Sequence, residues 1–193
     1  MTQTIASLKP FEAERDTSSP NRNLAPITTA LDGEDRLVIG GCLLSELAQR
    51  YGTPLYVLDE DTVRATCLAY RDALQQHYPG TSLPVYASKA NSSLLMSSIA
   101  AAEGLGLDAV SAGELLTALQ GGMPGERMVL HGNNKNDEEL LLAYNNNVTV
   151  VVDNQHDLDR LKALIPADAE PARLMLRFTP GIECHTHEYI RTG

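Results

Sequence analysis

The sequence predicts an α/β protein that contains part of a TIM-type (β/α)8 barrel, about five of its eight strand–helix units. Short apolar runs begin near Pro84, Gly106, Arg127, Val148 and Arg173, at spacings of 22, 21, 21 and 25 residues. A helical segment lies between each run and the next. The chain has no G-x-G-x-x-G fingerprint, which would favour a dinucleotide-binding Rossmann sheet.

The part of the chain before this repeat is less regular. Residues 1–35 carry three prolines and scattered charges, and we expect a poorly ordered leader. A short strand with a glycine turn is predicted at residues 37–41, followed by a helix from Leu43 to Tyr51 that Gly52 stops. A second strand is expected at 54–58. A longer helix then starts at Asp61 and ends before Gly80.

The repeat has the features of a buried parallel sheet. Its strands are continuously apolar, as in Val148–Val152, which is typical of strands that are covered on both faces. The helices that alternate with them are expected at Ser93–Glu103, Gly113–Gln120, Asp137–Asn145 and Gln155–Leu164. We therefore expect the helices to pack against a parallel sheet.

Polar side chains follow the predicted strands where each one ends. They are Lys89, Ser111 with Glu114, His131 with Asn133, Asp153 with Asn154, and Arg177. In a barrel the carboxyl ends of all strands meet at one pole, where active sites are built. A lysine held there can have a lowered pKa and form a Schiff base, although a lysine at a strand end is also commonly just a solvated terminus.

Composition limits the possible partners. The chain has 193 residues, a net charge of −10 and a pI near 4.9, which argues against nucleic acid or an anionic membrane as its main partner. No basic segment precedes an apolar core at the N-terminus, so no secretory signal is predicted. Three widely spaced cysteines suit free thiols in a reducing compartment, and we expect a cytoplasmic protein.

Three motifs have two interpretations each. Ser111 and Glu114 have the spacing of a capping box, and a capped helix start at a barrel mouth can also bind an anion. The segment from His131 to Lys135 is either a Gly/Asn-rich turn or a cofactor contact. Cys184–His187 contains His-x-His, but no matching ligand pair exists elsewhere and we expect no metal site.

Four strings together resemble a known family. They are Tyr86–Asn91, Leu107–Glu114, His131–Lys135 and Pro180–Ile190. In this order they are similar to fold-type III pyridoxal-phosphate decarboxylases, and the last string resembles the diaminopimelate branch in particular. The resemblance extends from about Leu37 to Gly193. Ser88 departs from it, because many members have valine at that position.

The resemblance implies roles for individual residues. Lys89 would bind pyridoxal 5′-phosphate covalently and be the catalytic residue. Asp108, Glu114, His131, Asn133 and Arg177 would line the cofactor site. Residues 36–60 would contribute partly to a separate β-domain, and residues 61–193 would form the incomplete barrel.

The implied activity is the decarboxylation of meso-2,6-diaminopimelate to L-lysine and CO2 in lysine biosynthesis, by a homodimer. Since five units do not close a barrel, we expect the chain to be the N-terminal part of a larger protein or a truncated product, and to be inactive alone. The alternatives are another decarboxylase of this fold, acting on arginine, ornithine or carboxynorspermidine, and a non-catalytic relative that serves as a binding module. Retention of Lys89 argues against the binding module.

Overall fold

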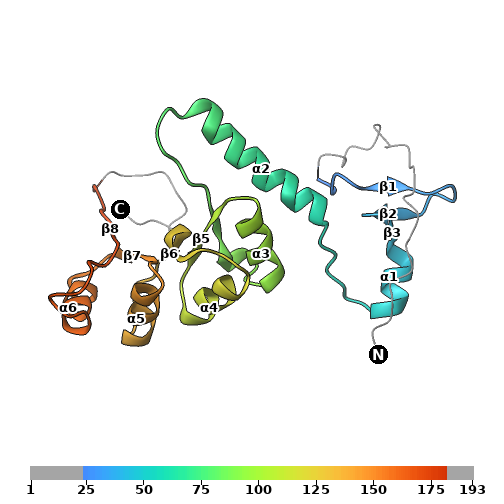
Figure 1. The fold of residues 1–193 in the computed structure, drawn as a ribbon. Coiled ribbons are helices and arrows are strands. Elements are labelled where there is room, and N and C mark those ends of the chain that lie inside the picture. Colours follow the sequence, from blue (N-terminus) through green and yellow to red (C-terminus); the bar gives the residue numbers. More distant parts are fainter. Residues whose placement is uncertain (1–23, 182–193) are drawn as a thin grey trace. The chain divides into compact units, whose positions relative to one another are not determined.

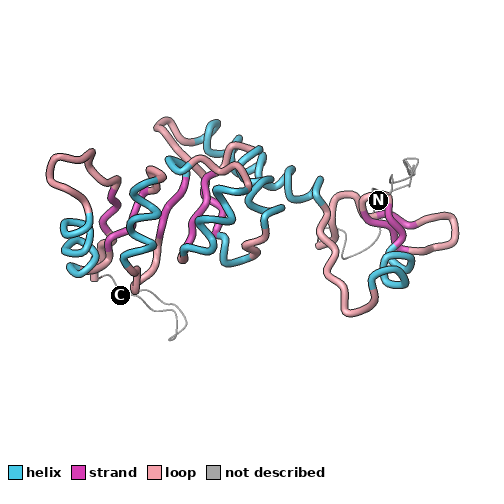
Figure 2. Tube along the Cα trace, turned by 60° about the horizontal axis from the view of Figure 1, so that its bottom comes forward, coloured by secondary structure: helices cyan, strands magenta, loops and turns pink. Residues whose placement is uncertain are grey.

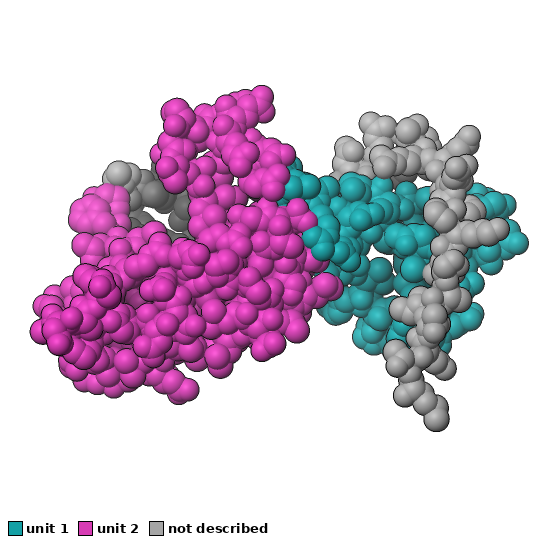
Figure 3. Space-filling view, in the orientation of Figure 1, with its two compact units in different colours: residues 1–69 teal, residues 70–193 magenta. Residues whose placement is uncertain are grey.

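The computed structural model describes residues 24–181 of the chain (Figure 1). The chain divides into two compact units, residues 1–69 and 70–193 (Figure 3). Helix α2 (Glu60–His77) runs across the division. Each unit has a sheet of its own, three-stranded in the first and five-stranded in the second.

The first unit is built on a small antiparallel sheet of strands β1 (Ala30–Leu31), β2 (Leu37–Ile39) and β3 (Cys42–Leu43). The turn between β2 and β3 consists of Gly40 and Gly41, which have φ values of 57° and 74°. A two-residue hairpin turn of this kind needs positive φ at both positions, so glycine is the residue that fits. Helix α1 (Leu44–Tyr51) follows and ends at Gly52, as predicted.

Regular structure begins within the segment that was predicted to be a poorly ordered leader, residues 1–35. Ala30–Leu31 pairs with β2, and Asp32 accepts hydrogen bonds from the backbone of Glu34 and Arg36, both at 2.9 Å. The prediction of a poorly ordered segment is therefore wrong at its C-terminal end. Residues 1–23 lie outside the described part of the chain.

Residues 54–58 do not form the predicted strand. Within residues 24–181 no strand pairs with this segment, and Leu55, Tyr56, Val57 and Leu58 are exposed. An apolar, β-branched sequence favours extended backbone, but a strand requires a neighbour for its hydrogen bonds. The prediction is wrong because the sequence pattern carries no information about that neighbour.

A buried aspartate joins the hairpin to helix α2. Asp59 accepts hydrogen bonds from the backbone N–H of Thr62 (3.0 Å), from the Thr62 hydroxyl and from the Thr28 hydroxyl (2.8 Å). Thr28 in turn accepts from the backbone of Gly40 at 2.9 Å. Burial alone would raise the pKa of Asp59, but these hydrogen bonds outweigh it and hold the pKa below the ordinary aspartate value.

The second unit contains five parallel strands whose spatial order is their order in the chain. They are β4 (Val85–Ala87), β5 (Gly106–Ala109), β6 (Met128–Leu130), β7 (Thr149–Val152) and β8 (Leu174–Leu176). Helices connect successive strands: α3 (Leu94–Ala102), α4 (Ala112–Gln120), α5 (Asp137–Asn145) and α6 (Gln155–Leu164). The fold class predicted from the repeat is confirmed.

The two faces of this sheet differ in burial. All four helices lie on one face, as Figures 1 and 2 show, because right-handed crossovers that proceed in one direction place every helix on the same side. Leu107, Met128, Leu130 and Val150 are almost fully buried. The strand residues that alternate with them include the exposed Val85 and Met175 and the partly exposed Asp108. In a closed barrel this second face would be the interior.

Each helix of the repeat begins with a side-chain cap. Ser93, Ser111, Asn136 and Asn154 accept hydrogen bonds from the backbone of the first helical turn. These residues satisfy orphan N–H groups and fix where each loop ends and each helix begins. None of the helices in the described residues is long and apolar enough to cross a membrane.

Replacement of Asp59 by alanine should lower the free energy of unfolding by about 1–2 kcal/mol, because the cap of α2 and the acceptor for Thr28 are lost together. Asp59→Asn keeps one acceptor and should lose less. Because the pKa of Asp59 is lower in the folded state, its contribution is present above about pH 4 and is lost as the pH falls through the lowered value. Urea unfolding of the wild type and Asp59→Asn across this range measures the difference, and equal pH slopes would contradict it.

Two glycines of the second unit are required by space. A Cβ on Gly125 would lie 1.6 Å from the carbonyl oxygen of Asn146, and one on Gly106 would lie 2.3 Å from that of Arg127.

We expect Gly125→Ala to lower the free energy of unfolding by at least about 1–3 kcal/mol. Gly113→Ala is the matched control, because the nearest atom would be 3.9 Å away and alanine in a helix should gain about 0.5–1 kcal/mol. The thermal unfolding midpoint should be lowest for Gly125→Ala, intermediate for the wild type and highest for Gly113→Ala.

Candidate functional site

The candidate site lies at the carboxyl ends of the parallel strands. Ala87, Asp108 and Val129 are neighbours across β4, β5 and β6, so residues that follow these positions project from one edge of the sheet. His131 follows β6, and Arg177 follows β8. The topology thus gathers polar residues that are far apart in the sequence.

Lys89 lies in a short 3-10 turn, η1 (Ser88–Ala90), directly after β4. The buried hydroxyl of Ser88 donates to the carbonyl oxygen of Asp108 at 2.9 Å, and the Tyr86 hydroxyl donates to the carbonyl of Asn91 at 3.0 Å. These bonds fix the backbone on both sides of the lysine. The Lys89 side chain is exposed, and its amine has no hydrogen bond or ion pair with residues 24–181.

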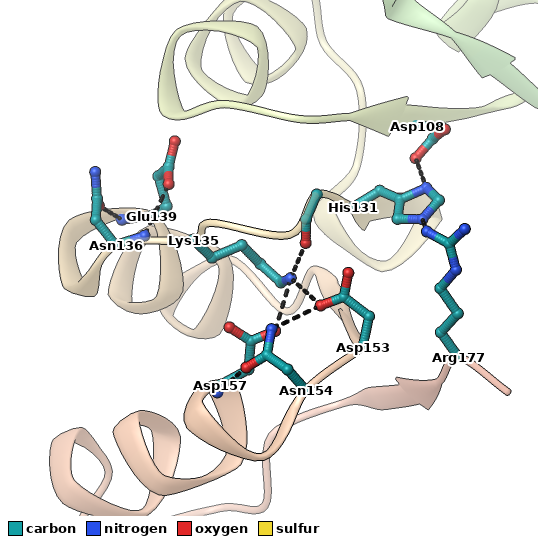
Figure 4. Close-up of polar contacts among 10 residues, drawn as sticks. Asp108, His131, Lys135, Asn136, Glu139, Asp153, Asn154, Asp157 and Arg177 are labelled. Atoms are coloured by element: carbon teal, nitrogen blue, oxygen red, sulfur yellow. Dashed lines mark hydrogen bonds and ion pairs between the residues drawn. The ribbon is translucent and has the colours of Figure 1, made fainter. Parts of the chain in front are cut away.

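Asp108, His131 and Arg177 form a row across the strand ends (Figure 4). Nδ1 of His131 is 3.7 Å from Oδ1 of Asp108, and Nε2 of His131 is 3.4 Å from Nη1 of Arg177. An arginine can only donate, so Nε2 accepts in this arrangement. A neutral His131 therefore carries its proton on Nδ1, facing Asp108.

One oxygen of Asp108 is left without a partner. Oδ1 is buried and makes no hydrogen bond with the described residues. The 3.7 Å approach of His131 is too long to count as one. A buried carboxylate oxygen without a donor is costly, which makes this atom a natural acceptor for a bound group.

Glu114 has a local partner already. Its Oε2 accepts a hydrogen bond from the backbone N–H of Val110 at 2.6 Å, while Ser111 accepts from the backbone of Glu114 at 3.3 Å. Ser111 caps α4 as predicted, but the predicted capping box is not completed, because Glu114 accepts from the backbone of Val110 and not from that of Ser111. This pairing stabilises the strand-to-helix turn after β5.

Asn133 is exposed in the loop between β6 and α5, and its side chain makes no hydrogen bond with residues 24–181. The preceding Gly132 has φ of 117°, a conformation that L side chains rarely adopt. This loop thus turns sharply just after His131. The string Cys184–Ile190 and its possible metal ligands lie outside the described residues.

A buried ion cluster beside this loop is not evident from the sequence. The ammonium of Lys135 lies 2.8 Å from Oδ2 of Asp157 and 3.5 Å from Oδ1 of Asp153, and it donates to the carbonyl of Gly132 (Figure 4). The Lys135 and Asp157 side chains are 1% and 2% exposed. Burial would raise the pKa of Asp153, but the charge of Lys135 and the hydrogen bonds outweigh it and lower that pKa. In the sequence, Asp153 appears only as a polar residue at a strand end and Lys135 only as part of a Gly/Asn-rich turn. Neither pattern predicts that these side chains are buried.

Further contacts join the helix starts to one another. Glu139 closes a capping box with Asn136 and also accepts from the backbone of Ala112 at 3.2 Å, which links α5 to α4. Arg160 pairs with Asp137 and links α6 to α5. The loops around the candidate site are therefore tied together by side chains that are not themselves candidates for chemistry.

A cleft among the described residues lies elsewhere. It has a volume of about 260 Å³ and is lined by Tyr144, Asn147, Glu170 and Arg173, among others, near the amino ends of β7 and β8. Its main polar groups are in use, since Arg173 donates to the carbonyl of Asn147 at 3.2 Å and Tyr144 to that of Glu170 at 3.0 Å. This cleft is at the opposite strand ends from Lys89 and is not the candidate site.

Several curated proteins are similar to the chain over most of its length. A diaminopimelate decarboxylase from Synechocystis sp. is 47% identical over 183 residues, which is 91% of this chain and 39% of the relative. One from Bacillus subtilis is 43% identical over 168 residues, 86% of this chain and 38% of the relative. The chain thus spans about two fifths of the length of these relatives.

Solved structures give the same result for the fold. A diaminopimelate decarboxylase from M. jannaschii superposes with a TM-score of 0.74 at 30% identity, over 85% of this chain and 38% of that one. One from Helicobacter pylori, complexed with L-lysine, has a TM-score of 0.67 at 32% identity and covers 76% and 36%. A lysine/ornithine decarboxylase from Vibrio vulnificus, complexed with putrescine, has a TM-score of 0.58 at 26% identity and covers 76% and 37%.

The family model for the pyridoxal binding domain of pyridoxal-dependent decarboxylases matches residues 60–193. This match includes all five parallel strands and every candidate residue from Lys89 to Arg177. It confirms the family to which the four sequence strings pointed. The chain belongs to the pyridoxal-dependent decarboxylases.

Proposed function

We propose that the chain supplies the lysine-bearing part of an enzyme that decarboxylates meso-diaminopimelate to L-lysine and CO2. The observation that carries this proposal is the exposed amine of Lys89, which has no hydrogen bond or ion pair within residues 24–181. It follows β4, next to the strand that bears Asp108, and Asp108, His131 and Arg177 form the row along the same sheet edge. An amine that serves as a covalent attachment point must be accessible and not already committed to an ion pair.

The residues at this edge fit pyridoxal 5′-phosphate. Lys89 offers the amine for its aldehyde, and Oδ1 of Asp108, which accepts no hydrogen bond from residues 24–181, offers an acceptor for a donor group. The exposed guanidinium of Arg177 offers positive charge for a phosphate or a substrate carboxylate. When bound, the cofactor supplies an electron sink for the bond that breaks at the substrate Cα.

The residues of this chain would hold the cofactor and orient the groups beside it. Lys89 would hold the cofactor through its amine. His131 would lie between Asp108, 3.7 Å from its Nδ1, and Arg177, 3.4 Å from its Nε2, and these two neighbours would orient its ring. Glu114 and Asn133 complete the proposed set. Glu114 supports the turn after β5, and Asn133 has donor and acceptor groups free of any partner in residues 24–181.

Similarity to relatives supports diaminopimelate as the substrate. The relatives at 47% and 43% identity are named for this activity, and the solved relative at 32% identity holds L-lysine, the product expected here. The lysine/ornithine decarboxylase is less similar, at 26% identity. Ornithine or arginine decarboxylation is the second candidate. The chain covers less than half of the length of each of these relatives.

We also propose that residues 36–60 contribute to a β-domain distinct from the barrel of residues 61–193, and that the enzyme is a cytoplasmic homodimer. The separate antiparallel sheet of β1–β3 supports the first point. Membership of the decarboxylase family supports the second. Light scattering of the purified protein would measure the subunit number directly.

Cofactor attachment can be tested on the chain with few competing amines. It has four lysines, Lys9, Lys89, Lys135 and Lys162, of which Lys135 is buried and Lys89 and Lys162 are exposed. After incubation with pyridoxal phosphate and borohydride reduction, peptide mass spectrometry should find the pyridoxyl group on Lys89. Lys89→Ala should lose it, and Lys162→Ala should retain it. Equal labelling of Lys89 and Lys162 would overturn the assigned role of Lys89.

Substrate choice can be tested on the natural protein that contains this chain. We expect CO2 release from meso-diaminopimelate to exceed that from arginine and ornithine, and Lys89→Ala to abolish it, because alanine has no amine that would hold the cofactor covalently. Lys162→Met, on the exposed face of α6, is the control that should leave the rate unchanged. Release from arginine or ornithine alone would establish the second candidate instead.

A further inference from the structure

Lys135 is a lysine with almost no exposure to solvent. Its side chain is 1% exposed and packs against Asp157, at 2% exposed, and Asp153, at 11%. Taking an ammonium out of water costs several kcal/mol unless the remaining contacts are good, and a buried pair of this kind often adds no net stability. Stability alone is therefore a weak reason for burying this charge.

The contacts of Lys135 show what the charge holds. Asp153 follows β7 and Asp157 lies in the first turn of α6, so both carboxylates belong to the strand–helix unit that follows. On the other side, the ammonium donates to the carbonyl oxygen of Gly132. The lysine thus fastens the loop that follows β6 to the neighbouring unit.

The carbonyl that Lys135 holds belongs to the residue between His131 and Asn133. On the other side of His131, its backbone N–H donates to the carbonyl of Ala109 at 2.8 Å, which ties it to β5. With φ of 117° at Gly132, the loop has no regular hydrogen-bond ladder to keep it in place. Its position is set from β5 on one side and from Lys135 on the other.

We propose that Lys135 is a positioning residue, which fixes the turn His131–Gly132–Asn133 and so orients the His131 imidazole between Asp108 and Arg177. This role rests on the proposed function, since it concerns the same cofactor site. In this role Lys135 would act through the turn and not by contact with the cofactor or the substrate. Its ammonium is paired, so it does not compete with Lys89 for the aldehyde.

The test needs a variant that loosens the turn and leaves as little buried charge as possible. Lys135→Met alone would strand two carboxylates, whereas Lys135→Met combined with Asp157→Leu removes both closely paired charges and is the kind of exchange that folds are known to accept. Asn154 keeps an acceptor in Asp153, at 2.9 Å. Lys162→Met is the matched control, because Lys162 is exposed on the same helix α6.

Two readouts separate positioning from stability. The first is the NMR signals of the His131 ring nitrogens, and the second is the concentration of pyridoxal phosphate that labels half of Lys89. In the folded double variant we expect the His131 signals to shift and the half-labelling concentration to rise by up to about 100-fold, the effect of a small misplacement at a site. Lys162→Met should change neither.

A folded double variant with unchanged His131 signals and unchanged labelling overturns the proposal. If the double variant does not fold, Asp153→Asn takes its place, because it removes the charge of the more distant of the two carboxylates that face Lys135, and it must shift the His131 signals relative to the wild type. No shift in Asp153→Asn also overturns the proposal. If the wild type takes no label on Lys89, the proposed function fails, while the His131 signals still decide the role of Lys135.

Discussion

Everything at the candidate site depends on five strands that run parallel in the order of the chain. Because the order never reverses, each crossover adds a helix to the same face. Because the strands are parallel, every loop that follows a strand begins at the same edge of the sheet. One edge of the sheet therefore brings together four residues that are distributed over positions 89–177 of the sequence: Lys89, Asp108, His131 and Arg177. No single local motif could bring them together.

A parallel sheet places strand ends but leaves the loops to be fixed by side chains. Three kinds of contact do this in the second unit: caps at the helix starts, carboxylates that reach a neighbouring unit, and the buried ammonium of Lys135. Glu139 links α5 to α4, while Lys135 links the loop after β6 to α6. Such contacts order the candidate residues before any ligand arrives, which lowers the entropy lost on binding.

The sequence was sufficient to predict the repeat, because continuous apolar strands and capped helices are local signals. Each of the four repeat helices begins and ends within one residue of its predicted bounds. It was sufficient also to predict that Lys89, His131 and Arg177 follow strands. The prediction of a strand at 54–58 failed because the sequence of a segment does not show whether another strand lies beside it to pair with. The burial of Lys135 could not be predicted either, since it depends on Asp153 and Asp157, 18 and 22 positions away.

The central claim is that Lys89 and the row of Asp108, His131 and Arg177 form one cofactor site. A crystal structure of the natural protein, solved after borohydride reduction with pyridoxal phosphate, tests this most directly. We predict a pyridoxyl group on Nζ of Lys89 whose ring lies in contact with Asp108 or His131. A pyridoxyl group on Lys89 that extends into solvent, away from both residues, would contradict the account.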